Sequence, residues 1–250
     1  MKKTILKQAL AVMFATLVVN AHSTASETVI KENRKTEKFS KLHISSGIEV
    51  YFTQENKEKI TVEANEDVIH KISTDTNGET LVIEMKSGLK QSLFKSKTAR
   101  VYISAPKLEK VTVTSASKLY ADKIKSDNSF VLKVSSASTA DLNSITAKKN
   151  TEITVTSAAK ADVTNLETEK CTLHASSTGK IKATVNVKTD LKLSAASTAG
   201  IEASGSAENV EVEASSAATV NIQALSYKSI DVTKSSAASV KRKKISETDK

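Results

Sequence analysis

A short pattern of apolar and small residues recurs seven times between residues 111 and 240. Each copy begins with two apolar residues separated by one position. The pairs are Val111/Val113, Leu132/Val134, Ile153/Val155, Cys171/Leu173, Leu191/Leu193, Val210/Val212 and Ile230/Val232. The second members of these pairs follow one another along the chain at nearly constant intervals. A period of about 20 residues indicates a repeat protein in which each copy stacks on the next.

A small residue follows four positions after each pair, and the alternation of apolar and polar positions continues beyond it. These small residues are Ser117, Ser138, Ala159, Ser177, Ser197, Ser216 and Ser236. Ala121, Leu142, Val163, Ile181, Ile201, Val220 and Val240 follow eight positions after the pairs. A fixed residue type at a fixed offset places equivalent positions in one row along the stack. The small residues predict tight bends where the walls of each coil approach closely.

These lengths favour a parallel β-solenoid over a β-sandwich. At ~3.3 Å per residue, about 20 residues make a circuit of roughly 66 Å, and stacked coils rise by about 4.8 Å each. Parallel crossover connections are right-handed. We therefore expect an all-β fold whose residues 111–240 form a right-handed parallel β-solenoid (β-helix) of about seven coils.

Residues 39–110 also alternate with period two, in shorter runs separated by turns. Asn77-Gly78 is a strong hairpin signal, so we expect local antiparallel pairing in a β region that caps or extends the solenoid. Residues 68–72 fit either a strand or one helical turn. Residues 86–98, rich in lysine and serine, predict a loop or a mobile flap, and the polar residues 27–38 predict a flexible leader.

The first 26 residues have the pattern of a signal peptide. Lys2, Lys3 and Lys7 accompany an apolar stretch over residues 9–19, which is too short to span a bilayer as a helix. The alternative is an uncleaved anchor or a buried helix. A signal peptide predicts export to the periplasm, the outer envelope or the medium, with no transmembrane segment remaining after cleavage.

The formal net charge of +9 is concentrated at the two ends of the chain. Loss of residues 1–26 leaves +6, and the basic tail over residues 241–250 accounts for a further +3. Arg34 and Arg100 are the only arginines before the tail, and aromatic residues make up 4% of the chain, so the sequence argues against nucleic-acid binding. Lys234 interrupts a row of Ser and Ala. Lys234 and the tail fit either a solvated gatekeeper against end-to-end stacking or a site for a polyanion or a membrane surface.

No group of residues in the sequence forms a recognisable catalytic, metal or cofactor site. Cys171 shares a row with Val111, Leu132 and Ile153, which predicts a buried thiol. His174 follows a repeat anchor, in a row with Thr114, Ser135, Thr156 and Ser194, and is interpreted as a surface residue. Asp141 and Asp162 occupy equivalent positions in adjacent coils, where they could hold calcium or act in a carbohydrate-active enzyme. Alternatively, the neighbouring Lys160 and Lys180 could neutralise the two acids.

Three features of the chain resemble one known family. They are the start Phe39-Ser-Lys-Leu-His-Ile-Ser-Ser-Gly-Ile-Glu-Val-Tyr-Phe-Thr-Gln, the segment Ala105-Pro106-Lys-Leu-Glu-Lys-Val-Thr-Val-Thr-Ser-Ala-Ser, and the repeats rich in serine and alanine. Together they resemble the "putative auto-transporter adhesin, head GIN domain" family over residues 39–240. The resemblance implies an exported bacterial β-solenoid without a catalytic motif. Here the corners hold serine and alanine where such proteins often hold glycine.

The sequence thus predicts an exported, non-enzymatic, adhesin-like protein of the cell envelope with no cofactor. Its partner would be a glycan, an envelope polymer or another copy of the chain. One alternative is a carbohydrate-active β-helix enzyme, a polysaccharide lyase or hydrolase, that uses Asp141 and Asp162. A second alternative is a purely structural envelope component.

Overall fold

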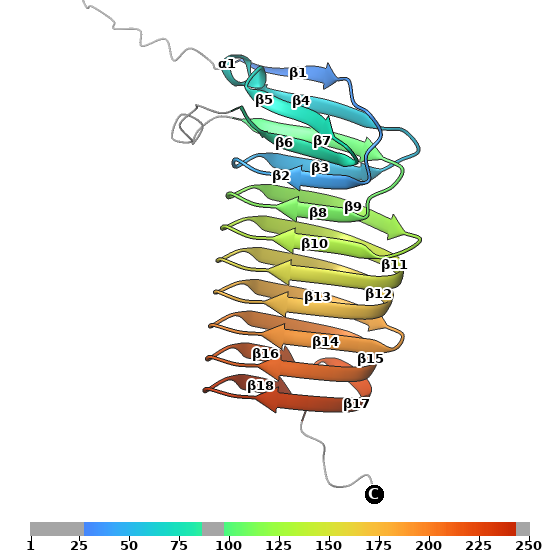
Figure 1. The fold of residues 1–250 in the computed structure, drawn as a ribbon, viewed down its shortest axis with the longest axis vertical. Helices are drawn as coiled ribbons and strands as arrows, with labels where there is room; N and C mark the ends of the chain where they lie inside the picture. The colour runs from blue at the N-terminus through green and yellow to red at the C-terminus, as the bar shows by residue number, and fades with distance from the viewer. Residues whose placement is uncertain (1–27, 87–97, 244–250) are drawn as a thin grey trace, which may run out of the picture.

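The computed structural model describes residues 28–86 and 98–243, and over these the chain is an elongated β-solenoid (Figure 1). The predicted signal peptide and most of the predicted loop over residues 86–98 lie outside the described residues. In Figure 1 the strands of the near sheet run to the left, the chain turns at the left edge, and the far strands return to the right while the chain descends. This path makes a right-handed coil, as the sequence predicted.

Two parallel sheets form the walls of the solenoid. The near sheet, here called the anchor sheet, contains β2 (Lys41–Ile44), β8 (Lys110–Val113), β10 (Phe130–Val134), the second halves of β11 (Thr139–Val155) and β12 (Lys160–Ala175), β14 (Asp190–Ala195), the second half of β15 (Gly200–Ala214) and β17 (Leu225–Lys234). The far sheet, here called the return sheet, contains β3 (Glu49–Gln54), β9 (Lys118–Ser126), the first halves of β11, β12 and β15, β13 (Lys180–Val187), β16 (Thr219–Ile222) and β18 (Ser239–Arg242).

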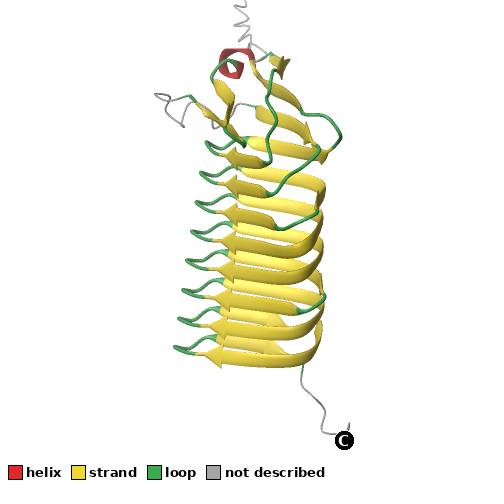
Figure 2. Ribbon diagram, turned by 45° about the vertical axis from the view of Figure 1, so that its right-hand side comes forward, coloured by secondary structure: helices red, strands yellow, loops and turns green. Residues whose placement is uncertain are grey.

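Each coil passes from the anchor sheet to the return sheet through a two-residue corner (Figure 2). Both central residues have positive φ, for example Ser136 at 54° and Ala137 at 60°. The described part of the chain contains eight such corners: Ser46/Gly47, Ser115/Ala116, Ser136/Ala137, Ser157/Ala158, Ser177/Thr178, Ser197/Thr198, Ser216/Ala217 and Ser236/Ala237. This left-handed conformation costs an L-residue roughly 1–2 kcal/mol. Serine and alanine keep the steric part of that cost low because little lies beyond their Cβ.

Hydrogen bonds within and between coils stabilise these corners. In the corner at Ser136, the amide of Ser138 donates to the carbonyl of Ser135 at 3.2 Å and closes the turn. The amide of Ala137 donates to the carbonyl of Ser157 in the next coil at 3.0 Å. The same two bonds recur along the stack, so each corner stabilises the conformation of its neighbour.

The core lies between the two sheets and consists of stacked aliphatic rows. Leu132, Ile153 and Leu173 are adjacent in register, and each is 0% exposed. Because side chains alternate across each strand, the positions between them point outward and form polar rows along the solenoid. The outer surface of the protein is therefore an ordered lattice of side chains.

The structure corrects the row assignment from the fourth repeat onward. Val155 pairs with Ala175 rather than Leu173, and Thr151 pairs with Cys171. The expected row of Cys171 with Ile153 was therefore wrong by two residues, and the expected positions of Ser177, Ser197, Ser216 and Ser236 shift in the same way. A slip of two residues leaves every side chain on the same side of the sheet, so the apolar pattern alone does not reveal it.

The N-terminal region continues both sheets and covers the first end of the solenoid. β6 (Thr80–Met85) adds in parallel to β2, and β5 (Ile72–Asn77) pairs antiparallel with β6 through the predicted hairpin turn at Gly78. On the return sheet β7 (Ala99–Ala105) adds in parallel to β3, and β4 (Lys59–Asn65) pairs antiparallel with β7. Residues 66–69 form one helical turn, α1 (Glu66–Ile69), so residues 68–72 are divided: Val68 and Ile69 end α1, and Ile72 begins β5.

The prediction of a flexible leader over residues 27–38 was wrong for its central part. Residues 29–34 form β1 (Val29–Arg34), which pairs antiparallel with β4. This strand has little apolar periodicity, because its support comes from backbone pairing and from polar contacts. Lys31 forms an ion pair with Glu63 at 3.0 Å, and Arg34 donates to the carbonyl of Ile69 at 3.0 Å.

The C-terminal end of the described chain is less covered than the N-terminal end. Ile230 and Val232 of β17 are only partly buried, whereas their neighbours Val210 and Val212 are 3% and 0% exposed. Lys234 follows Ala214 in a row of core positions, which corrects its expected row, and it is exposed. An inward-pointing charge in a terminal strand opposes edge-to-edge association, which supports the gatekeeper interpretation. Within the described residues, no helix is both long and apolar enough to cross a bilayer.

Corner stability can be tested at Ala137, which is exposed. We expect Ala137→Val to lower the free energy of unfolding by about 1–2 kcal/mol, because a β-branched residue is strained at positive φ. Valine also lacks the hydroxyl that Thr178 and Thr198 use in equivalent corners to bond the preceding carbonyl. Ala137→Gly should leave it unchanged or raise it by up to ~1 kcal/mol. Denaturant unfolding of the two variants measures the difference, and equal stability would contradict the strain argument.

The gatekeeper interpretation can be tested with Lys234→Val. This change joins the partly exposed Ile230 and Val232 into a larger apolar end surface, so we expect stronger concentration-dependent association than in the wild type, measured by sedimentation velocity. Lys133→Val is the matched control, since Lys133 is an exposed lysine of β10 with paired strands on both sides. Equal association of the two variants would rule out a special role for Lys234.

Candidate functional site

The predicted pair Asp141 and Asp162 lies on the return sheet, adjacent in register and pointing outward. Lys160 forms an ion pair with Asp162 at 2.5 Å, as the sequence suggested. Burial, and then the negative charge of Asp162, raise the pKa of the Asp141 carboxyl above its usual value. Within the described residues no group of three His, Cys, Asp or Glu side chains forms a metal site, so nothing there completes the suggested calcium site.

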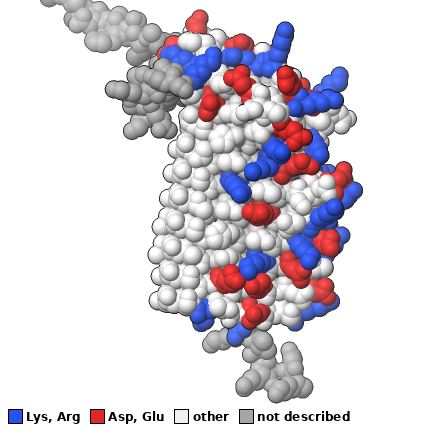
Figure 3. Space-filling view, viewed as in Figure 1, with Lys and Arg blue, Asp and Glu red and all other residues white. Residues whose placement is uncertain are grey.

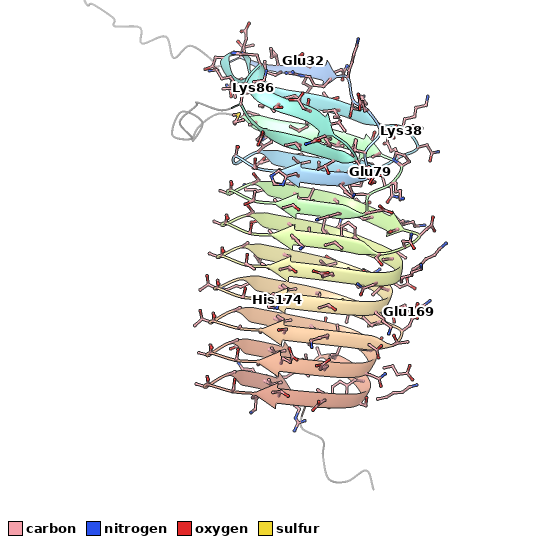
Figure 4. All side chains as sticks on the ribbon, in the orientation of Figure 1. Glu32, Lys38, Glu79, Lys86, Glu169 and His174 are labelled. Atoms are coloured by element: carbon pink, nitrogen blue, oxygen red, sulfur yellow. The ribbon has the colours of Figure 1, made fainter. Side chains whose placement is uncertain are left out.

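His174 and Cys171 lie away from these acids. His174 is on the anchor sheet, between Thr154 and Ser194, and not in the row with Thr156 that the sequence suggested (Figure 4). Cys171 is buried in the core, and burial raises the pKa of its thiol to about 12, so it is protonated at neutral pH. The carboxylates and the histidine therefore lie on opposite sheets.

Charged side chains on the anchor sheet largely neutralise one another. Lys192 forms ion pairs with Glu211 at 3.0 Å and with Glu213 at 2.9 Å, and Lys170 pairs with Asp190 at 3.0 Å. Figure 3 shows charges crowding the edge opposite the corners and the N-terminal end, while the corner edge in view carries almost none. A depression of about 480 Å³ between Asp190 and Asp231 is lined by these mostly paired groups.

A tyrosine ladder that the sequence analysis missed occupies the first part of the return sheet. Tyr51 stacks on Tyr102 at 5.2 Å and on Tyr120 at 5.0 Å between ring centroids. The ammonium of Lys31 lies 5.5 Å from the Tyr102 ring centroid, and Asp141 follows Tyr120 in the same row. Because the rings stack on one another, their faces do not form an open platform for a sugar. The outward positions of these tyrosines were visible in the sequence, but their shared row depends on register.

Ion pairs beside the ladder connect the N-terminal region to the first coils. Glu49 lies between Arg100 at 3.5 Å and Lys118 at 2.9 Å, while Glu63 contacts Arg100 at 3.2 Å and Lys31 at 3.0 Å. Hydrogen bonding from Lys118 lowers the pKa of Glu49, and hydrogen bonding from Lys31 lowers that of Glu63. These ion pairs link β1, β4, β7, β3 and β9, and we call this network the staple.

An open trough of about 850 Å³ lies on the return sheet beyond Asp162, towards the C-terminal end. Two adjacent outward rows line it. The first row contains Lys160, Lys180, Gly200 and Thr219, and the second contains Asp162, Lys182, Glu202, Asn221 and Lys241. A Cβ atom placed on Gly200 would meet no atom within 4 Å, so the floor is open at this point.

The trough carries more positive than negative charge. Lys160 pairs with Asp162, and Lys182 pairs with Glu202 at 3.2 Å. Lys180 and Lys241 are exposed, and neither has an ion pair within the part of the chain that the structure describes. Thr184, Thr198 and Asn221 add neutral hydrogen-bonding groups. Chemically, the trough suits an elongated polar ligand with negative charges and hydroxyl groups.

A family model identifies the family of this chain, and solved structures share its fold. The family model "Putative auto-transporter adhesin, head GIN domain" matches residues 38–151 and 143–243. A crystal structure described as a putative adhesin from Bacteroides fragilis NCTC 9343 is 16% identical with a TM-score of 0.73, covering 87% of this chain and 98% of that chain. Another putative adhesin, from Parabacteroides merdae ATCC 43184, is 14% identical with a TM-score of 0.65, covering 88% and 98%. The sequence matches no curated protein.

The staple at Glu63 can be tested by acidification. A carboxylate whose pKa is lowered on folding stabilises the fold above its unfolded pKa, and this contribution is lost as the pH falls through the folded pKa. We expect the amide protons of β1 and β4 to lose protection below about pH 4.5, where protection is the exchange rate relative to the intrinsic rate at the same pH. Glu63→Gln should loosen these strands already at pH 7. Hydrogen exchange measures both effects.

Glu202→Gln is the control for Glu63→Gln, because it removes an exposed carboxylate from the same sheet. It should leave exchange in β1 and β4 unchanged. Wild-type protection of these strands in the Glu63→Gln protein would show that the network does not hold the N-terminal region in place.

Proposed function

Since this chain belongs to the "putative auto-transporter adhesin, head GIN domain" family, we propose that it is an exported, non-enzymatic, adhesin-like protein that binds a polymer of the bacterial cell envelope. The observation that carries the proposal is the trough on the return sheet, with its open floor at Gly200 and with Lys180 and Lys241, which have no ion pair among the described residues. A solenoid suits this role because its rows repeat at about 4.8 Å along one axis, so an extended chain can make successive contacts.

Two further observations support a binding role. The structures described as putative adhesins share this fold. Among the described residues, His174 lies on the anchor sheet, whereas Asp141 and Asp162 lie on the return sheet. His174 therefore cannot act as a catalytic base beside these two acids. The basic residues near the start and the apolar stretch over residues 9–19 support export, with the mature protein in the periplasm, the outer envelope or the medium.

A carbohydrate-active enzyme is the second candidate, and one observation favours it. Asp141 has a raised pKa beside a carboxylate one strand away, and paired carboxylates about 5 Å apart occur in retaining glycosidases. Against it, Lys160 holds Asp162 in an ion pair, and Asp141 does not line the trough. Binding without turnover is therefore the expected behaviour.

The proposal is tested with protein purified from the exported fraction. We expect it to be retained on immobilised envelope polysaccharide without releasing new reducing ends or unsaturated products. If such products are released by the wild type but not by the Asp141→Ala variant, the protein is a carbohydrate-active enzyme instead. A strictly monomeric protein that binds neither envelope fractions nor any glycan on an array would overturn the adhesin-like function and favour a structural role.

A further inference from the structure

The first row of the trough contains an unfavourable pair of neighbours. Lys160 and Lys180 are directly adjacent in register on β12 and β13, and both point outward. Like charges at directly adjacent positions in a sheet destabilise it. Asp162 relieves only Lys160, because its ion pair is with that residue. Over residues 28–86 and 98–243, no carboxylate forms an ion pair with Lys180.

The position after Lys180 in this row has no side chain. Gly200 occupies it with ordinary backbone conformation and open space around its missing Cβ. The next residue in the row is Thr219, whose side chain is also short. The surface beside Lys180 is therefore open towards the C-terminal end of the solenoid. A ligand group can approach Lys180 from this side without displacing another side chain.

The second row places two lysines at the limits of the same opening. Lys182 and Lys241 are three coils apart, with Glu202 and Asn221 between them, which corresponds to about 14 Å along the axis. Glu202 neutralises Lys182 alone. Among the described residues, the trough lysines without an ion pair are thus Lys180 near one end and Lys241 at the other.

We propose that the trough binds an acidic polysaccharide, aligned with the solenoid axis, whose carboxylate groups are bound by Lys180 and Lys241. This inference rests on the proposed function and specifies its ligand class. Thr184, Thr198 and Asn221 provide donors and acceptors for sugar hydroxyls between the charged contacts. The trough lining contains neither arginine nor an aromatic ring, so it lacks the stacking groups that single-stranded nucleic acids use.

The test measures binding of the exported protein to polygalacturonate and to uncharged dextran at low and at physiological salt. We expect binding to polygalacturonate that weakens with salt, and little binding to dextran. Lys180→Gln and Lys241→Gln should each weaken it by roughly three- to fivefold, which is the effect of losing an exposed ion pair. Gly200→Glu should weaken it further, because it places a carboxylate beside Lys180 in open space.

Lys133→Gln is the matched control, since it removes one exposed lysine charge from the opposite sheet and should leave binding unchanged. Equal binding to dextran, or wild-type affinity in both trough variants, would overturn the ligand assignment while leaving the adhesin-like function intact. Binding to single-stranded DNA as tight as to polygalacturonate, through the same lysines, would overturn the polysaccharide assignment. Failure to bind any envelope polymer would overturn both proposals.

Discussion

The left-handed corner between the two sheets is the constraint on which the rest of this structure depends. Two consecutive L-residues at positive φ are unfavourable alone, and they persist because each corner donates a hydrogen bond to the next, as Ala116 does to Ser136 at 2.9 Å. Serine and alanine suit such a corner because they are small, and at Thr178 and Thr198 the hydroxyl donates a hydrogen bond at 2.6 Å to the carbonyl of the preceding residue. Once the corners stack, they set the register of the return sheet and keep successive coils nearly equal in length.

A fixed register converts the sequence of each coil into rows along the outer surface. The rows on the anchor sheet mix acids and lysines that pair across coils, such as Lys192 with Glu211 and Glu213. The return sheet is divided instead. Its N-terminal part is covered by the stacked tyrosines and by the ion pairs that hold β1, β4 and β7. Its C-terminal part contains the adjacent Lys160 and Lys180, followed by Gly200. The two parts have the same backbone geometry, so it is the side chains that distinguish the ion-paired N-terminal surface from the surface proposed to bind a ligand.

The candidate site could be predicted only in part. Alignment of the repeats placed Asp141 beside Asp162, and the structure confirms this because those coils lie before the two-residue slip. Lys160 was expected near these acids for the same reason. The repeat alignment already placed Gly200 between Lys180 and Thr219. The trough was missed because the two-residue slip between the third and fourth repeats hid the pairing of Lys160 with Lys180 and of Asp162 with Lys182. The tyrosine ladder was missed because Tyr51 and Tyr102 belong to the N-terminal region, whose parallel pairing the hairpin signal did not reveal.

The sequence by itself determined the fold class and the approximate length of each coil, because alternating apolar positions and small corner residues are local features of the chain. It also identified Asn77-Gly78 as a turn and Cys171 as a core residue. Only the tertiary structure decided which residues of successive coils lie side by side, because shifting one coil by two residues leaves the same side chains buried. It likewise decided that residues 29–34 form a strand, since that strand depends on pairing with β4 rather than on its own side chains. Surface function in a solenoid is set by neighbours that lie one full coil away along the chain, and register determines those neighbours.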